Sequence, residues 1–212
     1  MTKLSEIASV AYLYSRHLLS DQGLLPKYSP SAILNTKVSF LIVDITRITG
    51  LDAIVNAANN ALGDGSGVNG AIHRAAGPDL VSECRRLGGC DTGDAKITRG
   101  YGLPAKYIIH TVGPVYYRHE RQTSAKLLES CYRRCLEVAI ENGVRSVAFS
   151  SISTGIFGYP IEEAAEIATS TVRLFLESEQ GAQIDNVVFA LFSKHDLEVY
   201  QKTIPQIFPQ TI

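Results

Sequence analysis

The sequence predicts an α/β protein with helices on both faces of a β-sheet. Strand-length apolar segments alternate along the chain with segments of helical periodicity. This alternation is typical of sheets that are covered on both sides. With 212 residues and 45% hydrophobic content, the chain is long enough to bury a good core as a single domain.

Charge and apolar patterning exclude several classes of protein. Twenty basic and 21 acidic residues give a net charge of −1, so no overall field attracts nucleic acid or an anionic membrane. No apolar run approaches the roughly 20 residues of a membrane span, and the N-terminus lacks a secretory signal pattern. We therefore expect a soluble cytoplasmic or nuclear monomer. Its four cysteines fit reduced thiols better than a disulfide framework.

The N-terminal segment has its own pattern. Apolar residues recur at helical spacing between Leu4 and Leu18, which predicts an amphipathic helix over residues 4–20. Gly23, Pro26 and Pro30 then indicate a linker. We therefore expect residues 1–34 to form a helix and linker packed on a domain of residues 35–212.

The remaining elements follow from periodicity in chain order. Residues 37–46 are rich in β-branched and apolar side chains and predict a buried strand that ends near Asp44. A carboxylate there could accept a hydrogen bond from an amino group such as that of adenine, or it could be a solvated strand-end residue. Further strands are expected at 52–57, 95–99, 107–111, 146–151 and 187–192, and helices at 78–87, 124–141, 161–178 and 195–203.

Residues 51–77 predict a strand, a glycine-rich loop and a helix. The apolar run Ala53–Val55 leads into asparagines at 56, 59 and 60, and the loop after them has glycines at 63, 65, 67 and 70. Val68 and Ile72 then begin a helical pattern. Free backbone N–H groups and a helix dipole at such a place favour an anion, so phosphate is the first ligand to consider.

A second loop, Ser150–Pro160, lies between another strand and helix. Small residues and glycines give it exposed N–H groups, and Phe157 is an aromatic that a plain turn would not need. The loop could be an ordinary connection with Phe157 in the core. Ligands of α/β sheets bind at the carboxyl ends of the strands. Two such loops at one sheet edge therefore favour a nucleotide-diphosphate site.

Two common nucleotide motifs fit poorly. Gly65, Gly67 and Gly70 match GxGxxG, but they begin eight residues beyond Ala57, whereas the dinucleotide-binding fingerprint follows its strand directly. This spacing disfavours a dinucleotide-binding oxidoreductase. The GxxxxGK[ST] motif is missing, which excludes a P-loop.

Other reactive side chains have structural explanations. Cys131 and Cys135 have the spacing of a core helix face, and no metal-ligand motif accompanies them, so we expect no metal. Cys84 and Cys90 are expected to be free thiols. His73 could contact ligand or water, or it could be a packing residue. His110 lies within an apolar strand and is expected to be a core residue.

Four motifs in order resemble the macrodomain family, and within it the MacroD-like branch. They are DAIVNAANNAL, GxGVNGAIHRAAGP, TGDAKITRGYGLPAKYIIHTVGP and SSISTGIFGYP, and the resemblance runs from about residue 35 to 209. It implies a three-layer α/β/α domain with a central mixed β-sheet that binds ADP-ribose and needs no cofactor. Many MacroD-like members remove mono-ADP-ribose from acidic side chains or deacetylate O-acetyl-ADP-ribose, so the implied partners are ADP-ribose and ADP-ribosylated proteins.

The resemblance also assigns site residues. Asp44 matches the residue that holds the adenine amino group, and Ile45 lies beside it under the ring. Asn59 matches the residue that hydrogen-bonds the distal ribose and helps to position the reactive carbon. Phe157 lies against the same ribose. The two diphosphate loops are matched by Gly65, Gly67 and Val68, and by Ser153, Thr154, Gly155, Ile156 and Phe157.

Three positions depart from the family pattern. Val43 replaces a glycine before Asp44, and Asp64 stands where another glycine is usual. Asn69 occupies the position of the aspartate that activates the attacking water. An amide cannot accept a proton, and losing a general base costs about 10² to 10⁴ in rate.

Binding should survive the change at Asn69. Removing a carboxylate about 6 Å from a pyrophosphate also removes a repulsion of roughly 3 kcal/mol before screening. Hydrolysis could persist through a water activated by the substrate's own phosphate, or through Asp64. The sequence thus predicts a weakened hydrolase, with a non-catalytic ADP-ribose reader as the alternative.

Overall fold

A six-stranded sheet organises the computed structural model, which describes residues 1–21 and 23–211. The strand order is β2-β8-β7-β4-β6-β5, and neighbours are parallel except that β5 is antiparallel to β6. The mixed sheet is therefore confirmed. Its strands are β2 (Val38–Ile42), β4 (Ala53–Ala57), β5 (Ala95–Arg99), β6 (Tyr107–Thr111), β7 (Ser146–Ser150) and β8 (Asn186–Leu191).

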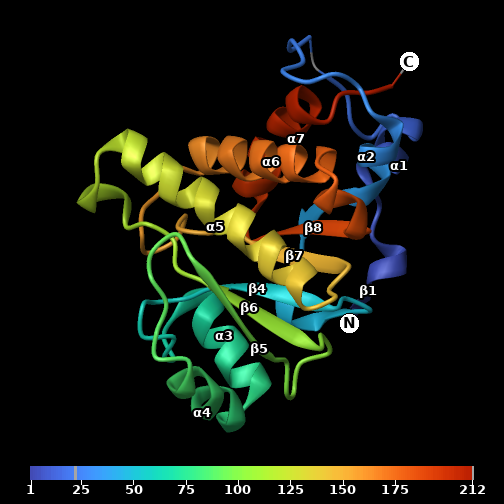
Figure 1. The fold of residues 1–212 in the computed structure, drawn as a ribbon. Coiled ribbons are helices and arrows are strands. Elements are labelled where there is room, and N and C mark those ends of the chain that lie inside the picture. The colour runs from blue at the N-terminus through green and yellow to red at the C-terminus, as the bar shows by residue number, and fades with distance from the viewer. Residues whose placement is uncertain (22, 212) are drawn as a thin grey trace.

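Helices cover both faces of this sheet and complete the three layers (Figure 1). Helices α3 and α4 lie on one face, whereas α5, α6 and α7 lie on the other. Among the described helices none is long and apolar enough to cross a membrane. The bounds are α1 (Val10–Ser15), α2 (Ala32–Lys37), α3 (Gly67–Ala76), α4 (Pro78–Arg86), α5 (Arg121–Glu141), α6 (Ile161–Glu177) and α7 (Lys194–Ile207).

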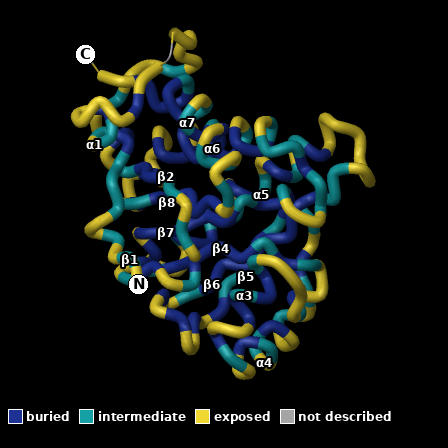
Figure 2. Tube along the Cα trace, turned by 180° about the vertical axis from the view of Figure 1, so that it is seen from behind, coloured by how far each residue is buried: buried dark blue, intermediate teal, exposed yellow. Residues whose placement is uncertain are grey.

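The strands feed two hydrophobic cores because successive side chains point to opposite faces. In β7, Val147 and Phe149 belong to the core under α5 to α7, and Ala148 belongs to the core under α3 and α4. In β8, Val187 belongs to the core under α5 to α7, and Val188 belongs to the core under α3 and α4. The trace along the central strands is accordingly buried, and exposed segments lie mainly in the loops (Figure 2).

Most predicted elements match the structure closely. The strands at 95–99 and 107–111 have the predicted bounds. Helix α5 begins earlier than predicted, at Arg121, and α7 continues to Ile207. Strand β2 ends before Asp44 because that side chain caps a 3-10 turn over Ile45–Arg47, accepting a hydrogen bond from the Thr46 N–H.

The predicted helix over residues 4–20 is wrong. Thr2–Lys3 forms a short strand, β1, which pairs with β3 (Ile48–Thr49). The helix is confined to α1, whose first turn is capped by the Ser9 side chain. Leu18, expected on the buried face, is 63% exposed. The helix ends at its C-cap residue Arg16, and His17 follows it with a positive φ of 55° that does not continue a helix.

The N-terminal segment contacts helix α6 and the end of the chain. The Tyr14 hydroxyl donates to the Phe208 carbonyl at 3.1 Å, and Arg173 donates to the Ser29 carbonyl at 2.7 Å. Helix α2 begins within the expected linker and continues to Lys37, so the boundary expected at 34/35 falls inside a helix.

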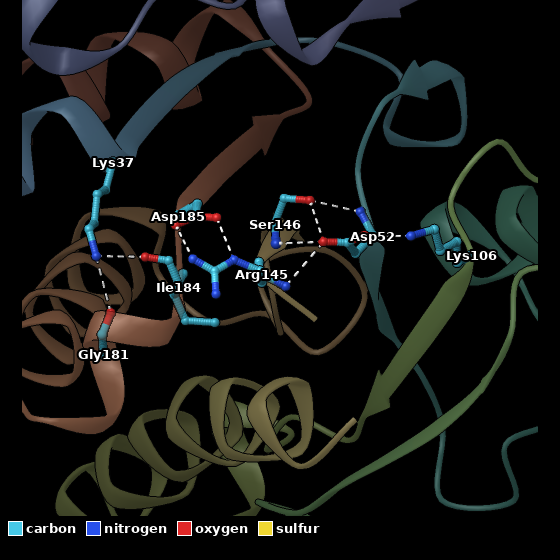
Figure 3. A network of polar contacts seen from close by, with 8 residues as sticks. All are labelled: Lys37, Asp52, Lys106, Arg145, Ser146, Gly181, Ile184 and Asp185. Carbon is cyan, nitrogen blue, oxygen red and sulfur yellow. Dashed lines mark hydrogen bonds and ion pairs between the residues drawn. The ribbon is translucent and has the colours of Figure 1, made fainter. Parts of the chain in front are cut away.

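A polar network joins the amino ends of the parallel strands (Figure 3). One Asp52 oxygen accepts from the backbone N–H groups of Arg145 and Ser146, both at 3.1 Å, and the other accepts from Lys106. The Arg145 guanidinium makes two hydrogen bonds to Asp185. These contacts fix the amino edge of the sheet, and the loops that carry the candidate site leave the opposite edge.

Candidate functional site

The two glycine-containing loops lie at the same edge of the sheet, as predicted. Strands β4 and β7 are parallel neighbours, with Ala53 opposite Val147. The loops that follow them therefore leave the sheet side by side at its carboxyl edge.

The first loop runs into the N-terminus of α3. Ser66 is the N-cap residue and makes no side-chain capping bond. The first N–H groups of a helix have no partner within it, so those of Gly67 and Val68 are available to an anion. A side chain at Gly70 would place its Cβ 2.2 Å from the Gly65 carbonyl oxygen. Only glycine at 70 lets the helix approach the loop this closely.

Asn59 is held by the backbone N–H and carbonyl groups of Gly63. Its Oδ1 accepts from the Gly63 N–H and its Nδ2 donates to the Gly63 carbonyl, both at 3.1 Å. The side chain is half-buried. A neutral amide in a fixed orientation suits the hydroxyl groups of a sugar.

Asn69 is 6% exposed, and both polar atoms of its side chain bind within the protein. Its Oδ1 accepts from Asn56 Nδ2 at 2.8 Å, and its Nδ2 donates to the Gly63 carbonyl at 2.9 Å. Asp64 is exposed, and its Oδ1 accepts from the Gly65 N–H at 2.7 Å. The amide at 69 thus supports the loop, while the carboxylate at 64 lies at the loop surface.

The second loop presents a run of backbone N–H groups. Those of Thr154, Gly155, Ile156 and Phe157 make no hydrogen bond to the described part of the chain. Ser153 has a positive φ of 65°. Its carbonyl accepts from the N–H at position 159, which closes the loop. The two loops therefore offer N–H donors from both sides of one edge, which suits a pyrophosphate.

Phe157 is half-buried and belongs to neither core cluster. The alternative that places it in the core is therefore wrong. Its carbonyl accepts from the Tyr116 N–H at 2.9 Å, which ties the loop to the segment before α5. Ile156 beside it is 84% exposed, whereas Tyr159 is buried.

Asp44 lies at the same edge, after strand β2. Its Oδ1 accepts from the Thr46 N–H at 3.0 Å and from the Thr46 hydroxyl at 2.6 Å, whereas Oδ2 makes no bond to the described residues. Ile45 is buried in the core, so little of its side chain faces solvent. From β2 to β4 the edge spans three strand spacings, or about 14 Å. This length suits an extended nucleotide.

Sequence reasoning missed Phe192. This side chain is 91% exposed and directly follows β8, the strand between β2 and β7. The Val43 N–H donates to the Leu191 carbonyl at 3.2 Å, which places Phe192 next to the segment of Asp44. An exposed aromatic at this edge offers a face for a base to stack on. An aromatic immediately after the apolar run at 187–191 was the signal available in the sequence.

Buried polar atoms without hydrogen bonds gather around this edge. Most buried polar groups in proteins are paired, so these atoms are exceptions. Of the seven such atoms among the described residues, only Asn35 Oδ1 lies elsewhere. The others are Asn56 Oδ1, both ring nitrogens of His73, the hydroxyls of Ser151 and Ser153, and the Tyr159 hydroxyl.

Burial keeps the nearby histidines neutral and the cysteines protonated. Desolvation lowers the pKa of His110 to about 3 and also lowers the pKa of His73. It raises the pKa of the Cys84 and Cys90 thiols to about 11. Neither thiol is a nucleophile at neutral pH. The expected core position of His110 and the free state of the cysteines are confirmed.

Comparison with known proteins gives consistent matches. The Macro domain family profile matches residues 55–168. A macro domain-containing protein of Chlorobaculum tepidum is 56% identical over 170 residues, which are 80% of this chain and 96% of that protein. The ADP-ribose glycohydrolase MACROD2 of Xenopus laevis is 52% identical over 174 residues, which are 82% of this chain but 41% of that protein.

A solved structure agrees with this assignment. The crystal structure of the Trypanosoma brucei macrodomain in complex with ADP-ribose has a TM-score of 0.79 and 39% identity, covering 96% of this chain and 76% of that one. Three findings point to the same family. The fold has three layers, the profile match covers more than half of the chain, and two relatives are more than 50% identical to it. The chain belongs to the macro domain family.

Proposed function

We propose that this protein binds ADP-ribose at the carboxyl edge of the sheet and hydrolyses it, slowly, from mono-ADP-ribosylated acidic side chains or from O-acetyl-ADP-ribose. The observation that carries the proposal is the pair of loops with unbonded N–H groups on neighbouring parallel strands, with Asp44 at one end and Asn59 at the other. The glycohydrolase relative and the ADP-ribose complex of a related macrodomain support it.

The residues along the edge set the direction in which ADP-ribose lies, with adenine at one end and the distal ribose at the other. Adenine lies by Asp44, whose unbonded Oδ2 accepts from the amino group, and stacks on Phe192. The pyrophosphate accepts from the N–H groups at the start of α3 and from those of the second loop. The distal ribose lies by Asn59 and Phe157. The protein segment that carries the modification then extends from the ribose end.

Turnover is slowed because Asn69 takes up no proton. A positioned base contributes about 10² to 10⁴ in rate, and the Asn69 side chain instead bonds to Asn56 and Gly63. The remaining routes are a water activated by the substrate's own phosphate, or Asp64. Asp64 is exposed and lines a hollow of about 300 Å³ together with His73 and Arg74.

A reader that binds ADP-ribosylated proteins without turnover is the second candidate. The same observation at Asn69 favours it, because the amide strengthens the loop without supplying a base. The two functions share every binding contact and differ only in the fate of the bond at the distal ribose.

Release of ADP-ribose from a protein mono-ADP-ribosylated on glutamate distinguishes the two candidates. Rates are measured at saturating substrate for the wild type, Asn69→Asp and Asp64→Ala, so that changes in affinity do not affect the comparison. A weakened hydrolase releases ADP-ribose slowly, and Asn69→Asp releases it faster. No release by the wild type together with release by Asn69→Asp would reject the hydrolase and leave the reader.

Asp64→Ala tests the remaining route in the same assay. If the substrate's phosphate activates the water, this variant keeps the wild-type rate. If Asp64 is the base, its rate falls by about 10² or more.

A further inference from the structure

A buried chain of hydrogen bonds runs from the sheet to the first loop. His110 and Asn56 are opposite each other on the adjacent strands β6 and β4, and both are 0% exposed. Asn56 Nδ2 lies 3.1 Å from His110 Nδ1 and 2.8 Å from Asn69 Oδ1. On the far side of the imidazole, His110 Nε2 lies 2.9 Å from the Thr98 hydroxyl.

The direction of each bond in this chain is determined by its members. Asn56 Nδ2 only donates, so its two hydrogens go to Asn69 Oδ1 and His110 Nδ1. His110 must therefore be the neutral Nε2–H tautomer, which donates to the Thr98 hydroxyl. That hydroxyl donates onward to the Arg99 carbonyl at 3.2 Å. No donor faces a donor along the chain.

The chain ends on the backbone of Gly63, which holds the Asn59 amide. The Gly63 carbonyl accepts from Asn69 Nδ2 at 2.9 Å and from Asn59 Nδ2 at 3.1 Å, while the Gly63 N–H donates to Asn59 Oδ1. The Gly63 backbone therefore determines the orientation of the Asn59 amide. The loop at Gly65 also fits closely, because a Cβ there would lie 2.8 Å from Asn69 Nδ2.

We propose that Asn56 and His110 are positioning residues, which act through Asn69 and Gly63 to set the orientation of Asn59 toward the distal ribose. The inference rests on the proposed function, since it assigns the ribose to Asn59. In this chain Asn69 is the link in that relay, because its Oδ1 accepts from Asn56 Nδ2 and its Nδ2 donates to the Gly63 carbonyl.

The relay has a consequence that a general structural role does not have. ADP contains the adenine and the diphosphate but lacks the distal ribose. Disturbing the relay therefore weakens the binding of ADP-ribose and leaves the binding of ADP unchanged. Removing one hydrogen bond typically changes an equilibrium about three- to tenfold.

The test measures the dissociation constants of ADP-ribose and ADP by calorimetry for Asn56→Ala and His110→Phe. We expect each variant to bind ADP-ribose about three- to tenfold more weakly and ADP within twofold of the wild type. Asn35→Ala is the matched control, because Asn35 is also a buried asparagine and donates one bond, to the Pro209 carbonyl at 2.8 Å. This control should keep both affinities even where it lowers the melting temperature.

Equal losses for both ligands, or no loss for either, would overturn the relay. A wild type that fails to bind ADP-ribose would instead reject the proposed function itself. Nuclear magnetic resonance of the wild type provides a test that needs no variant. The ¹⁵N shifts of His110 at neutral pH should report the Nε2–H tautomer, and the Nδ1–H tautomer would contradict the relay.

Discussion

The Asn69 amide has a hydrogen-bond partner on each of its polar atoms, and both partners belong to the protein. Asn69 donates to the Gly63 carbonyl, which also accepts from Asn59, and it accepts from Asn56. Two consequences follow from an amide at this position. An amide takes up no proton at neutral pH, and its N–H group is a donor that the loop uses. Residue identity alone predicts the first effect, and only the hydrogen-bond partners show the second.

Phe192 gives a prediction at the opposite end of the site. Its exposed ring lies beside the segment of Asp44, and stacking a base on an aromatic ring contributes about 1–3 kcal/mol. Phe192→Ala should therefore raise the dissociation constants of ADP-ribose and ADP by the same factor, at least fivefold, as measured by calorimetry. Leu25→Ala, which removes another exposed apolar side chain, should affect neither. A loss confined to ADP-ribose would place the adenine elsewhere.

At the scale of elements, parallel pairing of β4 with β7 brings the two loops together. The sequence predicts this arrangement because alternating strands and helices produce parallel strands, whose following loops share one edge. The order of the site residues along the edge could not be predicted from periodicity. It depends on β8 lying between β2 and β7, a pairing between segments distant in sequence.

Two other features were beyond sequence reasoning for the same reason. The N-terminal helix begins only at Val10, and the chain before it makes long-range contacts: β1 pairs with β3, more than forty residues away, and Ser9 forms a bridge with Ser39. The buried relay depends on Asn56 facing His110 across two strands, and no local pattern in either strand indicates it. Local periodicity therefore predicts elements well, whereas contacts between distant segments decide the fine structure of the site.

The contact between α3 and the first loop gives a prediction at this scale. Gly70→Ala would place a methyl group 2.2 Å from the Gly65 carbonyl, which is backbone and cannot rotate away. The loop must shift, so ADP-ribose affinity should fall at least tenfold while the protein stays folded. Asn35→Ala is the control, since Asn35 is buried and bonds to the Pro209 carbonyl, away from both loops. Unchanged affinity in Gly70→Ala would mean that the loop does not need its close approach to α3.

For the whole molecule, the buried His110 links stability to pH. In the unfolded chain this imidazole takes up a proton near its ordinary pKa of 6.5, whereas burial lowers its pKa to about 3 in the folded protein. The unfolded state therefore binds more protons as pH falls from 6.5 to 3, and stability falls with it, by up to about 5 kcal/mol. Asp52, Asp94 and Asp185, whose pKa values are lowered, add a further loss below about pH 4.

Urea unfolding between pH 7 and pH 4 measures this effect. The free energy of unfolding of the wild type should fall as pH falls. Below about pH 6 the contribution of His110 should approach one proton, or about 1.4 kcal/mol per pH unit. His110→Phe should reduce that slope by one proton whatever its stability at pH 7. A wild type with constant stability from pH 7 to pH 5 would show that His110 takes up its proton without unfolding.

Calorimetric titration of the wild-type protein with ADP-ribose tests the central claim most directly, because every assigned role depends on this ligand at the carboxyl edge of the sheet. We expect saturable binding of one ADP-ribose per chain, abolished or strongly weakened by Asn59→Ala. No binding at millimolar ADP-ribose, or binding that is unaffected by Asn59→Ala, would contradict the account.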